Sequence, residues 1–142
     1  MIKIIIISVM TFSLLQAKQP ISQEIKKYVS SLIETNNQYL PKQLKDSLIT
    51  MEKTVVRNTN IFYNFTINDN GLNKKDSKSL NLLKTNKSRN IIRNSSIQET
   101  CKDEFNLGLL YMGYKITNIY KTKKNKDIKI KFDILFKDCK NN

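Results

Sequence analysis

The sequence contains no histidine and only three glycines. Histidine is the commonest general base and a main zinc ligand, so its absence excludes Ser-His-Asp and Cys-His sites within this chain. A glycine-rich phosphate loop is excluded as well, because Gly71, Gly108 and Gly113 are too few and too scattered. A carboxylate pair or an activated lysine is the alternative left open. We expect no enzyme activity, no cofactor and no metal site.

Arginine is nearly as scarce: three Arg stand against 22 Lys, and the formal net charge is +13. Such a charge favours nucleic acid, anionic membrane surfaces or acidic proteins as partners. A bias toward A/T-rich codons is the alternative, since it fills tolerant surface positions with Lys and Asn. The scarcity of Arg, which makes bidentate phosphate contacts, favours this second explanation.

The chain also lacks an apolar run long enough to cross a membrane. Met1-Ile2-Lys3 is a short basic start, Ile4 to Leu15 is mostly apolar, and Leu15-Gln16-Ala17 ends in a small residue, as a cleavage site does. This layout is typical of a secretory signal peptide, and the run is shorter than the about 20 residues that span a bilayer. We therefore expect a signal peptide at 1–17 and a periplasmic or secreted mature chain, residues 18–142, without a transmembrane segment.

There are only two cysteines, Cys101 and Cys139, and both lie in the part expected to be exported. An even count in an exported protein favours a disulfide, which would stabilise the fold by about 4 kcal/mol in the chain-entropy model. Two free thiols are the alternative. A redox-active pair is not expected because the spacing is not C-x-x-C. No cysteine follows the predicted cleavage site, so lipid attachment there is not indicated.

The N-terminal part of the mature chain has the pattern of an amphipathic helix. Ser22 can cap it, and Glu24 falls in its first turn. Apolar side chains recur at helical spacing at Ile25, Tyr28, Val29, Leu32 and Ile33. This stripe predicts a helix of about three turns that packs on the core.

Two β-like runs follow, and Asn58-Thr59-Asn60 separates them. Residues 48–56 are rich in β-branched side chains, and residues 61–67 alternate between two faces. Together they predict an antiparallel hairpin. Residues 72–90 predict a solvated loop, and residues 91–100 a helix with few apolar positions.

The C-terminal third has the clearest pattern. Asp103 can cap a short helix that ends at Gly113, and a strand with Tyr114, Ile116 and Tyr120 follows. Apolar residues at 128, 130, 132, 134 and 136 then alternate with mostly polar ones. This period of two predicts a strand with one face on the core and one in water. The fold expected from these elements is α+β: an N-terminal helix packed on a four-stranded antiparallel sheet of two hairpins, with one disulfide.

Lysines concentrate around the last predicted hairpin. They are Lys121, Lys123, Lys124 and Lys126 in its connection, and Lys129 and Lys131 on its outer face. These residues are the candidate surface for binding an acidic or envelope-associated protein. Nucleic acid is a less favoured partner, because proteins that bind single strands usually show several exposed aromatic side chains among the basic ones. The alternative is an ordinary solvated face.

The C-terminal third resembles a group of small exported bacterial proteins, the pilotin-type domains that assist assembly of outer-membrane secretion channels. The resemblance rests on Leu109-Leu110, Gly113-Tyr114 and Ile119-Tyr120 between Cys101 and Cys139, and on the Tyr-rich run 61–65. It spans residues 22–139 and implies a disulfide that brackets the last hairpin. Many pilotins are lipoproteins, whereas this chain has no cysteine in the position required.

Three functions are compatible with these observations. The first is a soluble periplasmic protein that binds another protein, as an accessory or assembly factor of an envelope or secretion system. The second is a secreted inhibitor or immunity protein whose basic hairpin covers an acidic site. The third is a periplasmic DNA-binding protein, whose affinity would fall steeply with salt.

Overall fold

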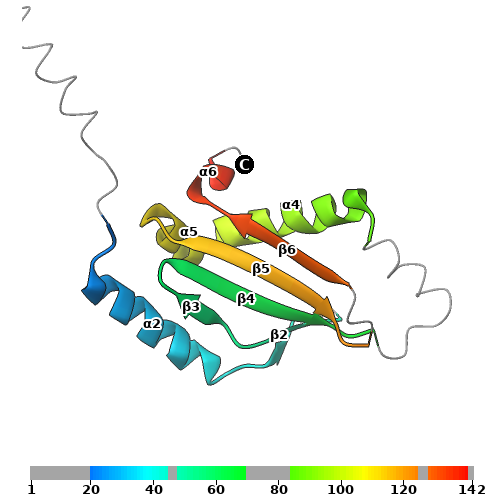
Figure 1. The fold of residues 1–142 in the computed structure, drawn as a ribbon, viewed down its shortest axis with the longest axis horizontal. Coiled ribbons are helices and arrows are strands. Elements are labelled where there is room, and N and C mark those ends of the chain that lie inside the picture. The colour runs from blue at the N-terminus through cyan, green and yellow to red at the C-terminus, as the bar shows by residue number, and fades with distance from the viewer. Residues whose placement is uncertain (1–19, 45–47, 70–83, 125–127, 141–142) are drawn as a thin grey trace, which may run out of the picture.

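The computed structural model describes residues 20–44, 48–69, 84–124 and 128–140. The predicted signal peptide, residues 1–17, and Lys126 lie outside these ranges. The described residues form four helices and six strands, so the predicted α+β class is confirmed (Figure 1). None of the described helices is both long and apolar enough to cross a membrane.

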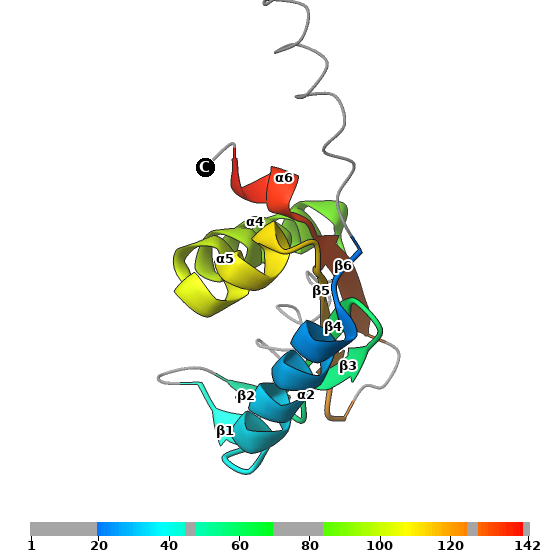
Figure 2. The same ribbon diagram turned by 90° about the vertical axis from the view of Figure 1, so that its left-hand side faces the viewer.

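The predicted N-terminal helix is α2 (Gln23–Asn37). Ser22 caps it, because its hydroxyl accepts a hydrogen bond from the Ile25 amide at 3.2 Å. Val29 and Ile33 are buried in the core, but the side chains of Ile25 and Tyr28 are 40% and 65% exposed. The expectation that the whole apolar stripe packs on the core is therefore wrong. The helix lies beside β3 (Figure 2), and the exposed fractions show that the core covers only one side of the stripe.

The first predicted hairpin is present, but its first strand is divided. β2 (Ile49–Met51) and β3 (Val55–Arg57) follow one another along the same edge of β4 (Asn60–Ile67), and both pair with it antiparallel. Asn58 turns the chain with a positive φ of 54°, which asparagine tolerates well. A further short strand, β1 (Lys42–Gln43), pairs with β2 and was not expected.

The predicted four-stranded antiparallel sheet is wrong in two respects. The sheet has six strands in the order β1-β2-β4-β5-β6, with β3 beside β4. β4 and β5 (Lys115–Thr122) are parallel over eight residue pairs, from Asn60 opposite Lys115 to Ile67 opposite Thr122. The two predicted hairpins exist, but the chain between them includes two helices, and a connection of that length allows a parallel crossover.

The crossover contains α4 (Asn86–Lys102) and α5 (Glu104–Tyr111). α4 begins at Asn86 because Thr85 caps it, so the last part of the loop predicted at 72–90 is helical instead. Residues 70–83 of that loop lie outside the described ranges. Asp103 caps α5 as predicted, and Gly113 has the positive φ, 100°, expected after the helix.

The predicted alternation of the last strand is confirmed as far as Ile134, but Phe136, the last apolar position of the prediction, lies beyond the strand. In β6 (Lys129–Ile134) and just before it, Ile128, Ile130 and Ile134 are buried, whereas Lys129 and Lys131 are exposed. The strand stops at Ile134 because Leu135 donates its amide to the Asp138 carboxylate and a helical turn, α6 (Phe136–Cys139), begins.

The predicted disulfide is present. Cys101, near the end of α4, is bonded to Cys139, and their Cα atoms are 5.5 Å apart. It attaches the crossover to the segment that follows the last strand.

α2, α4 and α5 cover one face of the sheet, and α4 and α5 lie together on that side in Figure 2. The main core combines Val29 and Ile33 of α2, Ile97 of α4 and Leu109 and Leu110 of α5 with Ile61, Ile116 and Ile134 of the strands. The second face carries no helix from the described residues. It faces the viewer in Figure 1.

Candidate functional site

A groove of about 810 Å³ lies on the helix-covered side of the sheet, between α2 and the α4–α5 pair. Its floor is the inner face of β2, β4 and β5, where α2 and the α4–α5 pair leave part of the strands uncovered. Met51, Phe65, Asn118 and Tyr120 form this floor. Cavities of this size are typical of ligand and peptide sites.

Stacked aromatic rings make the floor apolar and rigid. The Phe65 and Tyr120 rings are 4.6 Å apart and nearly parallel, and Phe132 lies 6.0 Å beyond Tyr120. The Tyr120 hydroxyl is held by the Ser96 hydroxyl of α4 at 2.8 Å. This bond joins one wall of the groove to its floor.

Tyr63 and Tyr120 in the groove are hydrogen-bonding groups with raised pKa values. Burial raises the pKa of Tyr120, and the hydrogen bond with Ser96 offsets only part of this effect. Burial and the charge of Asp103 also raise the pKa of Tyr63, whose hydroxyl donates to the Asn106 side-chain oxygen at 2.6 Å. Neither tyrosine can serve as a base near neutral pH.

Asn118 is the polar exception in the floor. Its side chain is only 4% exposed, and its Oδ1 atom has no hydrogen-bond partner among the described residues. It lies opposite Tyr63 and Phe132 on the neighbouring strands. A buried acceptor without a described partner is costly to the folded protein.

The lips of the groove carry exposed aromatic side chains and charge. Tyr39, which follows α2, is 75% exposed, and Phe105 of α5 on the opposite lip is 39% exposed. Glu99 and Asp103 line the α4–α5 side, and Lys42 the other. Exposed aromatics around an apolar floor are typical of a protein-binding groove, because such rings supply much of the energy of interfaces.

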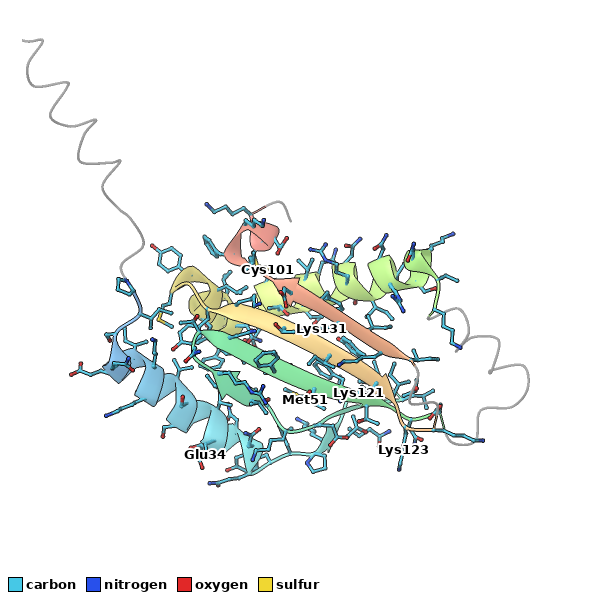
Figure 3. The ribbon with its side chains drawn as sticks, in the orientation of Figure 1. Glu34, Met51, Cys101, Lys121, Lys123 and Lys131 are labelled. Atoms are coloured by element: carbon cyan, nitrogen blue, oxygen red, sulfur yellow. A yellow bond between two sulfur atoms is a disulfide. The ribbon has the colours of Figure 1, made fainter. Side chains whose placement is uncertain are left out.

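The lysines predicted to bind a partner do not line this groove. Lys121, Lys129 and Lys131 project from the opposite face of the sheet, on which Figure 3 labels Lys121 and Lys131. Lys123 and Lys124 are exposed just after β5, and Lys126 is not described. The structure brings the five described lysines to one hairpin.

The charged side chains that line the groove are Glu99, Asp103 and Lys42. The described ranges hold no group of three or more acidic or cysteine side chains that could ligate a metal ion. Both cysteines are in the disulfide. The arrangement can bind an apolar segment and hydrogen-bond to it.

The groove residues were not expected from the sequence. The alternation at 61–67 predicts that Tyr63 and Phe65 share one face of the strand, but it does not predict that this face lines a groove. One signal was present: β4 and β5 offer more aromatic surface than a single helix can cover. The isolated Tyr39 after the helix, which lines the groove together with Met51, gave no periodic signal.

No protein-family model matches this sequence, and no curated protein does. Three solved structures share its fold. A protein of Pseudomonas aeruginosa classed as secreted aligns with a TM-score of 0.59 and 13% identity, over 82% of this chain and 93% of its own. The type II secretion pilotin EpsS of Vibrio vulnificus gives a TM-score of 0.57 and 13% identity over the same shares of the two chains.

The type II secretion pilotin AspS of Vibrio cholerae aligns with a TM-score of 0.52 and 8% identity, over 77% of this chain and 86% of its own. The predicted resemblance to pilotin-type domains is thus confirmed at the level of the fold.

Proposed function

We propose that this protein is a non-enzymatic accessory factor of an envelope or secretion system, and that it binds an apolar segment of another protein in the groove. Two solved structures with this fold are pilotins of type II secretion systems, which supports the class of function. The expected export to the periplasm or beyond agrees with it.

The groove itself is the observation on which the proposal depends. About 810 Å³ of space has a floor of Met51, Phe65 and Tyr120 and exposed aromatic lips. Left empty, such a surface exposes apolar area to water, which costs about 25 cal/mol for each Å². A partner segment with apolar side chains along one side would cover this area.

The walls add selectivity to the proposed binding. Glu99 and Asp103 on one side favour a segment with basic residues at its edge, and the amide of Asn118 offers a hydrogen bond at the centre. A buried polar group in an otherwise apolar contact fixes the register of the guest, because a misplaced guest leaves the group unpaired.

Site-specific photo-crosslinking in the host cell tests the proposal. A photoreactive amino acid replaces Tyr39 or Phe105 on the two lips, and in matched controls it replaces Tyr28 or Tyr111, which are 65% and 72% exposed but outside the groove. We expect one crosslinked protein at both lip positions, absent from both controls, and identified by mass spectrometry as an envelope component.

Equal crosslinking at the control positions would contradict the proposal, as would a lip partner that is a cytoplasmic protein. Substituting both Tyr39 and Phe105 by alanine should abolish the complex that forms in extracts. Because the two side chains are exposed, the circular dichroism spectrum should not change.

A further inference from the structure

Three lysines project from the sheet face opposite the groove, and two more follow directly after β5. Lys121 lies directly opposite Lys129 in the β5–β6 pair, and Lys131 follows two residues later on the same face. Lys123 and Lys124 continue from the end of β5. We call these five residues the lysine face.

The main chain fixes the position of the last two. The Lys123 amide donates to the Ile67 carbonyl at 3.0 Å, and the Lys124 amide donates to the Asp69 carboxylate at 2.6 Å. Both side chains remain exposed. The end of the hairpin is therefore held against the end of β4, with its ammonium groups in water.

The lysine face is electrostatically unfavourable for the free protein. Like charges directly opposite each other on neighbouring strands destabilise a sheet. Lys121, Lys129 and Lys131 form no ion pair with any described residue. The nearby carboxylate, Asp133, is already engaged by Lys115 at 3.1 Å and by the Thr117 hydroxyl at 2.7 Å.

We propose that the lysine face docks on a bilayer surface rich in anionic lipids. Lysine is a compact charge on a flexible stem, which suits the mobile headgroups of a bilayer, whereas fixed phosphates of nucleic acids favour the arginine fork. On this face the described arginine is Arg57, which lies over the Phe62 ring at 5.8 Å. The half-buried Phe62 is the aromatic residue here and leaves no exposed ring for base stacking.

A protein partner fits this face less well, because lysine is depleted in protein interfaces. The geometry also separates this face from the groove. The helices lie on one side of the sheet (Figures 1 and 2), the groove lies on that side, and Lys121, Lys129 and Lys131 project from the other. Docking on a bilayer would therefore leave the groove open and turned away from the lipid.

Vesicle sedimentation tests this proposal. The protein is mixed with vesicles of phosphatidylcholine alone or with added phosphatidylglycerol. We expect binding only to the anionic vesicles. It should disappear as the ionic strength rises from about 0.1 M to about 1 M, because the Debye length falls from about 10 Å to about 3 Å.

Two triple variants of equal net charge separate the lysine face from total charge. Lys121→Gln, Lys129→Gln and Lys131→Gln together should weaken binding roughly a hundredfold, about fivefold for each lysine. Lys27→Gln, Lys87→Gln and Lys137→Gln replace exposed lysines of α2, α4 and α6. They should change binding much less.

The single variant Lys129→Gln provides an independent readout. It removes the repulsion with Lys121 and should not lower the thermal midpoint. Equal losses in the two triple variants would overturn the proposal, as would binding to pure phosphatidylcholine or a fall in that midpoint. Tighter binding to duplex DNA than to anionic vesicles at the same salt would also overturn it and would assign the face to nucleic acid.

Discussion

Two consecutive residues of β5 show how differently a buried polar side chain can be satisfied. Thr117 is fully buried on the lysine-face side, and its hydroxyl donates to Asp133 at 2.7 Å while the Asn60 side-chain oxygen lies 3.0 Å away. Asn118 points to the groove, and its Oδ1 has no partner. The first side chain stabilises the fold, whereas the second leaves a buried acceptor without a described partner.

Replacing Asn118 by leucine should stabilise the free protein. The substitution removes a buried amide oxygen that has no described partner and replaces it with an apolar group, so we expect the free energy of unfolding to rise by about 1 kcal/mol. Urea denaturation measures this change. Asn64→Leu is the matched control, because the Asn64 amide donates to the Lys53 carbonyl at 3.0 Å and its loss should not stabilise. A destabilised Asn118→Leu variant would show that the amide supports the fold rather than a guest.

Asp133 should give the fold a pH-dependent contribution. Burial raises its pKa, but hydrogen bonds from Thr117 and Lys115 and the charges of Lys115 and Lys131 outweigh burial and hold the pKa below its ordinary value. The ionised carboxylate therefore stabilises the folded state. That contribution is complete above about pH 4, the ordinary pKa, and disappears as the pH falls through the lower folded pKa.

Asp133→Asn should accordingly lower the stability at pH 7 by less than about 1 kcal/mol, because the carboxylate is 44% exposed. The difference from the unsubstituted protein should shrink in urea titrations below about pH 4. Glu34→Gln, at an exposed position without a described ion pair, is the control. A difference that persists unchanged at low pH would mean that Asp133 acts by packing and not by charge.

At the scale of elements, one side chain joins α2 to the sheet. The Asn37 oxygen accepts from the Thr54 amide at 2.8 Å, and its NH₂ group donates to the Thr54 carbonyl at 2.9 Å. Thr54 lies in the break between β2 and β3 and is 5% exposed. The break is therefore a docking point for the helix, and it sets one wall of the groove.

Asn37→Ala should destabilise the protein by about 2 kcal/mol, since it leaves two buried main-chain groups without partners. Chemical denaturation measures the loss, and faster amide exchange at Thr54 should accompany it. Asn36→Ala is the natural control, because the neighbouring side chain is exposed and makes no described hydrogen bond. Equal effects of the two substitutions would argue that helix propensity, not the contact with Thr54, determines the result.

The sequence was informative where one segment determines its own structure. Alternation at 128–134, the caps Ser22 and Asp103 and the turn at Asn58 were all readable from local chemistry. The parallel pairing of β4 with β5 was not, because period-two patterns define faces and not strand order. The groove could not be predicted for the same reason, because Tyr39, Phe105 and Asn118 are brought to one site only by the order of the strands.

At the scale of the whole molecule, one sheet separates two surfaces of different chemistry. The groove side is apolar with an unpaired amide, and the other side is basic. The disulfide packs against the main core and joins the end of α4 to the chain that follows β6. Its loss should therefore affect the assembly of the molecule more than any single contact.

Reduction of the Cys101–Cys139 bond should lower the free energy of unfolding by about 4 kcal/mol. The two residues are 38 positions apart, and opening a loop of that length frees conformational entropy in the unfolded chain. This is a large share of the about 5–15 kcal/mol that stabilises a typical domain. Urea denaturation with and without reductant measures the difference.

The Cys101→Ser, Cys139→Ser double variant is the control. Its free energy of unfolding should equal that of the reduced protein and should not change when reductant is added. A loss below about 1 kcal/mol would instead mean that the reduced chain keeps the ends of this loop together without the bond.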